Sequence, residues 1–133
     1  MRRIMIPAFA LAALIATIGS AHPIDQGLTR PLTVQLSSFK FTPRTLQLQR
    51  GATYRIHFVN VSKGGHNFVA REFFAASMIA AADQGKVHNG QIDLARGEAV
   101  DVLLVPNQAG AFKSRCSHFM HSSFGMSGRI DVQ

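Results

Sequence analysis

Cysteine, acidic residues and aromatic residues able to hydrogen-bond are all scarce in this chain. Its 133 residues include one Cys, seven acids, one Tyr and no Trp, against ten Phe. The single cysteine, Cys116, excludes an intramolecular disulfide scaffold and a structural zinc site built mainly from thiolates. Only 16% of the residues are charged and 47% are hydrophobic, which excludes general disorder. The length corresponds to about one domain.

The first residues have the pattern of a secretory signal peptide. Two arginines precede an almost unbroken apolar run at 4–18, and small residues follow it. A membrane anchor is the alternative, but the run contains Pro7 and is shorter than the roughly 20 residues that a bilayer needs. We therefore expect a signal peptide over residues 1–21, cleavage after Ala21 and export, with the periplasm as the destination.

Export changes what the charge and the cysteine imply. The leader holds two Arg and no acid, so its removal lowers the formal charge from +7 to +5. The mature chain has no apolar run long enough to span a membrane. Export and the lack of a Lys/Arg cluster argue against a nucleic-acid partner, and we expect a monomer. A basic surface suits acidic redox partners or anionic headgroups. In an oxidising compartment, an odd Cys is an intermolecular partner, a reactive thiol or a metal ligand.

Alternation of apolar and polar residues predicts antiparallel strands over most of the mature chain. After a flexible lead-in at 22–31, the domain at 32–133 shows short runs with one apolar face, separated by turn residues. Residues 72–82 differ, because their Phe, Met, Ile and Ala residues fall at helical spacing. About eight short strands and one short helix inserted between strands predict an all-β sandwich. The predicted strands lie at 32–36, 39–41, 46–48, 54–60, 66–69, 100–105, 111–115 and 128–132.

One thiol, two imidazoles and a thioether carry the chemistry of the sequence. Cys116, His121 and Met126 follow one another at five-residue steps, so one loop between two strands can wrap them around a single ion. His66 would have to come from a neighbouring strand. Two His and one Cys in a trigonal plane with a weak axial Met are the ligands of a mononuclear blue-copper site. Because sulfur ligands favour Cu(I) while imidazole tolerates Cu(II), one copper ion is the predicted cofactor.

Two motifs together resemble those of the cupredoxins, the plastocyanin- and azurin-like blue-copper proteins. They are the Gly-His-Asn-Phe segment at 65–68 and the Cys-x4-His-x4-Met segment at 116–126, whose spacing is most similar to rusticyanin and auracyanin. The resemblance covers about residues 32–133. It implies a Greek-key β-sandwich of the cupredoxin type.

The resemblance also assigns roles to individual residues. It implies that Asn67 ties the two ligand-bearing loops together through hydrogen bonds and that the carbonyl of Gly65 approaches the metal weakly. The implied copper ligands are His66, Cys116 and His121 in the equatorial plane and Met126 on the axis. Both a blue site and a more tetragonal green site are compatible with this set.

Two departures from the family leave other ligands open. The loop lacks the Pro that the family often has between Cys and His, and it holds His118 and Met120. We favour His121 over His118, since Cys-x-His leaves little chain for closing a chelate around one ion. Met120, adjacent to His121, is poorly placed to reach the axial position. His22, at the N-terminus after cleavage, could chelate copper through its amine and ring, but the Cys-His-Met set argues for a different copper chemistry.

The resemblance implies an electron carrier rather than an enzyme, because protein side chains fill all four ligand positions. Its partners would be redox proteins such as a cytochrome or a copper oxidase or reductase. Phe119, Met120 and Phe124 would either surround His121 as a docking patch or pack into the end of the sandwich. A copper carrier or sensor that delivers copper to another exported protein is the alternative, supported by the extra ligands His118 and Met120. The complete ligand set disfavours a metal-free structural module.

Overall fold

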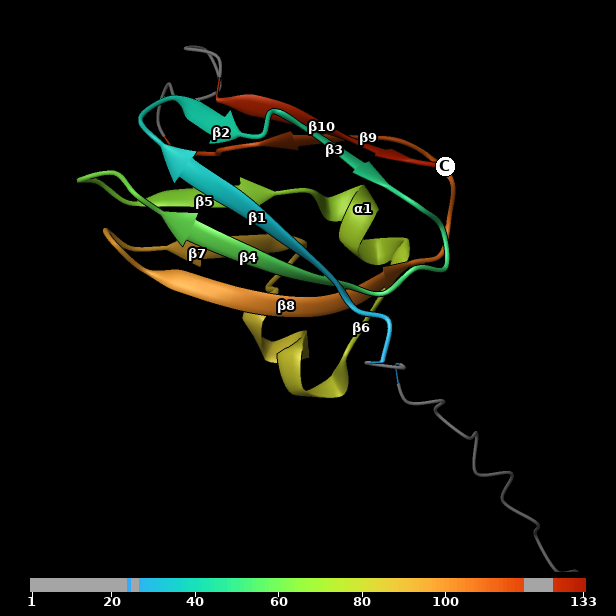
Figure 1. Cartoon of the computed structure of the whole chain (residues 1–133). Coiled ribbons are helices and arrows are strands. Elements are labelled where there is room, and N and C mark those ends of the chain that lie inside the picture. The colour runs from blue at the N-terminus through green and yellow to red at the C-terminus, as the bar shows by residue number, and fades with distance from the viewer. Residues whose placement is uncertain (1–23, 25–26, 119–125) are drawn as a thin grey trace, which may run out of the picture.

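Two five-stranded sheets pack face to face in the computed structural model, which describes residues 24, 27–118 and 126–133 (Figure 1). One sheet has the strand order β2-β1-β4-β8-β6 and the other the order β3-β10-β9-β5-β7. The all-β sandwich predicted from the sequence is confirmed, but β1 and β4, and likewise β3 and β10, pair in parallel and not antiparallel as the alternation suggested. The strands are β1 (Arg30–Ser37), β2 (Lys40–Thr42), β3 (Thr45–Leu48), β4 (Tyr54–Asn60), β5 (His66–Val69), β6 (Ser77–Ile79), β7 (Gln91–Leu94), β8 (Ala99–Pro106), β9 (Gly110–Arg115) and β10 (Ser127–Val132).

The core between the sheets is built from the apolar face of each alternating strand. In β4, for example, Tyr54, Ile56 and Phe58 are buried while Arg55 is exposed. Because successive strand residues point to opposite faces, this period of two buries one face of each sheet. Phe68 of β5 joins the sheets, since its ring contacts two rings from the opposite sheet and one from the following helix. These contacts are to Phe58 (5.0 Å between centroids), Phe41 (5.2 Å) and Phe74 (6.2 Å).

The helix predicted over residues 72–82 is much shorter in the structure. Helix α1 spans Arg71–Ala75, and the chain then forms β6 and the 3-10 helix η1 (Ala81–Lys86). Ser77 Oγ donates a hydrogen bond of 2.8 Å to the carbonyl of Phe73 where α1 ends. Pairing of β6 with the edge of β8 therefore prevails over the helical spacing of this segment. Within the described ranges, no helix is long and apolar enough to cross a membrane.

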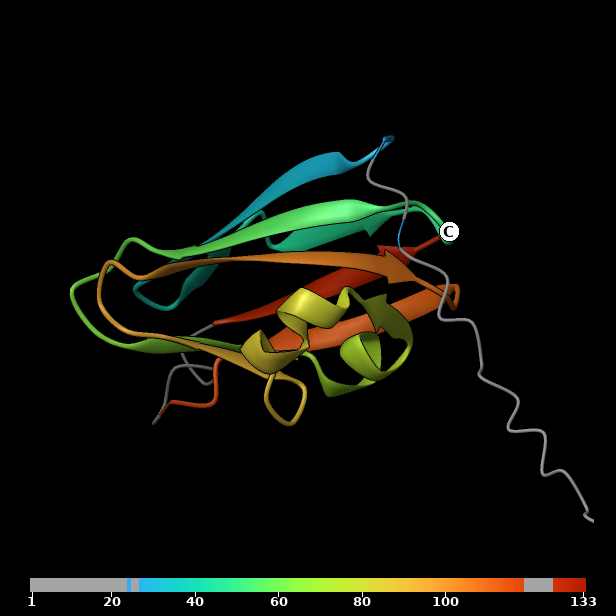
Figure 2. The same cartoon turned by 90° about the horizontal axis from the view of Figure 1, so that it is seen from below.

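Strand β7 has no counterpart among the strands predicted from the sequence. It pairs with β5 at the edge of the second sheet, and only Ile92 and Leu94 provide its apolar face. Figure 2 shows α1 and η1 on the side of the sandwich where β6 and β7 end the two sheets. The segment between β5 and β7 thus covers an open side of the core.

Asp83 anchors η1 to the sandwich. Its carboxylate accepts hydrogen bonds from the backbone N–H of Leu103 (2.8 Å) and from Lys86 Nζ (2.6 Å). Burial by itself would raise the pKa of Asp83, but the hydrogen bonds and the charge of Lys86 outweigh it and hold this pKa below its ordinary value of 3.8. The ionised carboxylate therefore stabilises the fold.

We expect Asp83→Asn to lower the free energy of unfolding by about 1–2 kcal/mol at neutral pH, because the amide loses the charged contact with Lys86. A lowered pKa means that this stabilisation is present above pH 4 and is lost as the pH falls through the pKa of the folded state. Urea denaturation of both proteins at pH 7 and pH 3 measures the effect. A difference that is equally large at both pH values would contradict the assignment.

Candidate metal centre

Three of the four predicted ligands lie where strands of one sheet meet at the same end. His66 is the first residue of β5, Cys116 directly follows β9, and Met126 directly precedes β10. Because β9 runs antiparallel to both β5 and β10, these three strand ends lie together, at the left of Figure 1. Cys116 and Met126 are also joined by a backbone hydrogen bond of 3.0 Å from the N–H of Cys116 to the carbonyl of Met126. His121 and Met120 lie outside the described residues.

The thiol and one imidazole approach each other in a buried environment. Cys116 Sγ lies 3.8 Å from His66 Nδ1, and the two residues are 0% and 4% exposed. Metal bonds of about 2.0 Å to nitrogen and 2.3 Å to sulfur, about 120° apart, would separate the two donor atoms by about 3.7 Å. The pair is therefore spaced as two ligands of one ion, a distance that also suits a weak hydrogen bond between thiol and imidazole. Met126, fully buried, completes the described part of the donor set.

Two hydrogen bonds join the His66 strand to the segment after Cys116. The amide of Asn67 donates from Nδ2 to Ser117 Oγ (2.7 Å), and its Oδ1 accepts from the backbone N–H of Ser117 (2.7 Å). Asn67 is 2% exposed while Ser117 is exposed, so both bonds are partly shielded from water. Because Asn67 follows His66 and Ser117 follows Cys116, these bonds can hold the two predicted ligands in fixed relative positions.

His118 also lies beside this pair. Its ring centroid is 6.2 Å from that of His66, with an angle of 34° between the rings. The ring of His118 packs against Gly65, since a methyl group added there would lie 3.4 Å from His118 Cε1, at van der Waals contact. His118 is exposed, in contrast to His66. Apart from the residues outside the described ranges, no three His, Cys, Asp or Glu residues form a group that could hold a metal.

Asn60 is a further residue of the site that the sequence reasoning did not identify. It ends β4 with no exposed surface, and its Nδ2 lies 2.7 Å from the carbonyl of Gly64, 3.1 Å from that of Leu94 and 3.2 Å from that of Ala95. Its Oδ1 accepts from the N–H (3.0 Å) and Oγ (2.8 Å) of Ser62. Asn60 therefore fixes the loop that leads to His66. The signal for it was its position on the inward face of β4, where an apolar residue would be expected.

We expect Asn60→Ala to lower the free energy of unfolding by about 2–3 kcal/mol, since it leaves buried backbone groups without hydrogen-bond partners. Ser62→Ala is the matched control, because it removes one hydrogen bond to the same Oδ1 and two exposed ones to the backbone of Gly64, and it should cost less than about 1 kcal/mol. Chemical denaturation of the two variants measures the difference. Equal losses in both would show that Asn60 does not organise the loop.

Solved structures of copper proteins share this fold. The Na-dithionite reduced auracyanin from Roseiflexus castenholzii superposes with a TM-score of 0.58 at 15% identity, over 77% of this chain and 96% of its own. Auracyanin B gives a TM-score of 0.55 at 20% identity, over 77% and 88% of the two chains. A multicopper oxidase gives 0.58 at 17% identity, over 79% of this chain and 42% of its own. At these identities the likeness concerns the fold alone.

The two-sheet sandwich with its His66–Cys116 pair defines the class of protein, which is a cupredoxin. The chain belongs to the plastocyanin/azurin family of copper-binding proteins, because the model of that family, "Copper binding proteins, plastocyanin/azurin family", matches residues 29–133. Copper is accordingly its cofactor. The copper-resistant cuproprotein CopI of Rubrivivax gelatinosus is 26% identical in an alignment of 128 positions that covers 85% of this chain and 78% of CopI.

Proposed function

We propose that this cupredoxin is exported to the periplasm and carries single electrons at a copper site formed by His66, Cys116, His121 and Met126. The observation that carries the proposal is the buried contact of 3.8 Å between Cys116 Sγ and His66 Nδ1. Copper, when bound, supplies the one-electron Cu(II)/Cu(I) couple. With four protein ligands the site has no open position for a substrate, so we propose a carrier rather than an enzyme.

The chain's own residues would keep the site rigid between the two oxidation states. The hydrogen bonds between Asn67 and Ser117 hold the two ligand-bearing segments together, and Asn60 fixes the loop before His66. Burial of Cys116 and Met126 keeps water from the sulfur donors. A site that changes little in geometry suits electron transfer, because little reorganisation accompanies each step. The partners would be redox proteins such as a cytochrome or a copper oxidase or reductase.

A copper carrier is the second candidate, and two observations favour it. CopI, the relative that is 26% identical, is named as a copper-resistant cuproprotein. In addition, the exposed imidazole of His118 lies beside the buried His66, where it could take over the ion during transfer to another protein. In this role the ligands would exchange readily, and the copper ion itself would pass to the partner protein without any transfer of electrons between the two proteins.

Retention of copper during redox cycling separates the two functions. The loaded protein is oxidised and reduced repeatedly in the presence of a modest copper chelator, and bound copper is measured after each cycle. An electron carrier retains its copper throughout, and His118→Ala leaves retention unchanged. Rapid loss of copper to the chelator, slowed by His118→Ala, would instead establish the carrier function.

A further inference from the structure

Three basic side chains gather on the outer face of the second sheet, close to the metal-binding end. Lys113 and Arg115 of β9 are exposed, while Ser114 and Cys116 between and after them are buried. Alternation along β9 thus turns one set of residues to the core and the other outward. Arg71, which follows β5 and begins α1, adds the third cation. Arg115 immediately precedes Cys116 in the chain, so this outer surface lies on the other side of the sheet from a predicted copper ligand.

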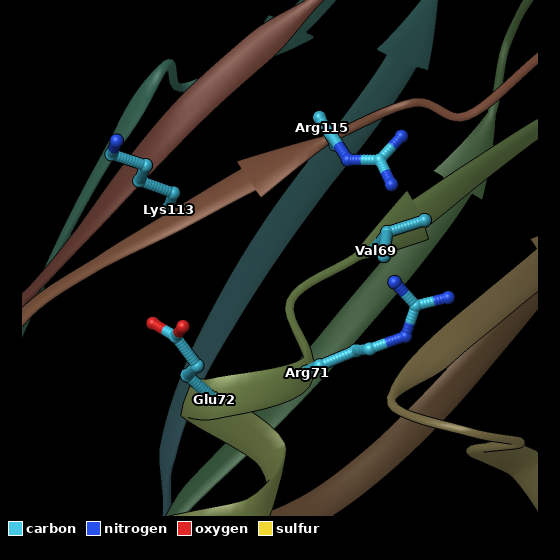
Figure 3. Close-up of a pocket in the computed structure, with 5 residues that line it drawn as sticks. All are labelled: Val69, Arg71, Glu72, Lys113 and Arg115. Carbon is cyan, nitrogen blue, oxygen red and sulfur yellow. The ribbon is translucent and has the colours of Figure 1, made fainter.

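These cations line a groove of about 250 Å³, here called the basic groove, formed by Val69, Arg71, Glu72, Lys113 and Arg115. Figure 3 shows Val69 between the guanidinium ends of Arg71 and Arg115, and Lys113 and Glu72 toward the other end of the groove. Val69 is paired with Arg115 across the sheet and is only 4% exposed. The groove therefore has an apolar floor and charged walls.

Arg71 is held in place before any ligand arrives. Its Nε donates a hydrogen bond of 3.2 Å to the carbonyl of Asn89. Gly90 packs so closely that an added methyl group would lie 2.6 Å from the Cα of Arg71 and 2.7 Å from its Cγ. Because its stem is fixed in this way, Arg71 would lose less conformational entropy on binding than a mobile surface arginine.

The charges of the basic groove are not neutralised by its surroundings. The ion pairs in the described part of the chain join His57 to Asp101, Lys86 to Asp83 and Arg129 to Asp131, none of which lines the groove. Three cations therefore face one acid, Glu72, whose carboxylate is in no ion pair among these residues. A concave surface with an excess of one charge concentrates the field and attracts ligands of the opposite charge.

We propose that the basic groove docks an extended acidic segment of a protein partner. Lys113 and Arg115 are two residues apart on one strand, which separates them by about 6.6–6.8 Å, the spacing of alternate side chains on an extended peptide. Arginine binds carboxylates through two parallel hydrogen bonds, and Val69 offers an apolar contact between two such groups. Glu72 would repel the continuous negative charge of a lipid surface more than a segment whose acids alternate with neutral residues.

This inference refines the proposed function, on which it rests for its biological role: a partner docked at Arg115 would lie on the outer face of the sheet, one residue along the chain from the buried Cys116. Its test measures binding alone. If copper retention and colour fail to match a cupredoxin electron carrier while the groove still binds the acidic segment, the proposed function fails and the docking surface stands.

The test uses the purified, copper-loaded protein and a fluorescent peptide of alternating glutamate and serine, with anisotropy as the readout. We expect Arg115→Gln to weaken binding about threefold to tenfold, which corresponds to the loss of one solvent-exposed hydrogen bond. Glu72→Gln should tighten binding severalfold, because it removes the repelling carboxylate. Arg50→Gln, an exposed arginine outside the groove, changes the net charge as Arg115→Gln does and should leave affinity unchanged.

Three results would overturn the proposal. Equal weakening by Arg50→Gln and Arg115→Gln would show that only net charge matters. An unchanged affinity in Glu72→Gln would show that the peptide binds elsewhere. Because the expected result for this variant is tighter binding, a misfolded protein could not imitate it. Binding to phosphatidylglycerol vesicles that depends on Arg115, with none to the peptide, would assign the groove to a membrane surface.

Discussion

Cys116→Ser is expected to abolish the intense visible band that Cu(II) gives with the wild-type protein. That band arises from charge transfer between a thiolate and copper, and this chain has no other cysteine to supply the thiolate. The serine hydroxyl is a weak ligand for Cu(II) at neutral pH, so copper affinity should also fall by more than tenfold. Addition of Cu(II) to the purified protein, followed by a visible spectrum and a titration, measures both effects.

Two controls make the result specific. Serine is close in volume to cysteine and can still hydrogen-bond to His66, so far-UV circular dichroism should show the sandwich intact. His118→Ala should keep the band, whereas His121→Ala should lose it. The opposite pair of outcomes would make His118 the equatorial ligand, and a wild-type protein with no such band would refute the blue-copper site altogether.

The sheets of this fold could be predicted from sequence wherever alternation was long enough. The run Tyr54, Ile56, Phe58 identifies the inward face of β4 without any tertiary information. The same reasoning failed in the segment after β5, because helical spacing at 72–82 is a local signal and pairing of β6 with β8 is a contact between distant parts of the chain. Strand β7 was missed for a related reason, since two apolar positions are too few to establish a period.

In the candidate site, too, residues in a recognisable sequence motif could be predicted, whereas residues that act through contacts with distant segments could not. The donor set and the resemblance to the cupredoxins pointed to Cys116 and His66, and the structure places their donor atoms 3.8 Å apart. Asn60 was not foreseen, because its importance comes from carbonyls far along the chain, at Leu94 and Ala95. The basic groove could not be predicted from the sequence either, since only the pairing of β5 with β9 brings Arg71 near Arg115.

Phe68→Ala should lower the free energy of unfolding by about 3–5 kcal/mol. Phe68 is 2% exposed, and its ring touches Phe41 and Phe58 of the opposite sheet. Alanine would leave a cavity between the sheets and remove these ring contacts. Urea denaturation with copper bound and after chelation measures the change.

Comparison with Phe68→Leu tests whether the loss comes from packing. Leucine keeps most of the apolar volume and should cost about 1–2 kcal/mol. Because Phe68 lies two residues after His66 on the same short strand, the alanine variant should also bind copper less tightly. Copper stabilises only the folded state, by about 2.7 kcal/mol at a hundredfold excess over Kd, so the gain on adding a fixed amount of copper should be smaller in Phe68→Ala than in wild type. An equal gain in both would show that the core around Phe68 and the copper ligands are independent.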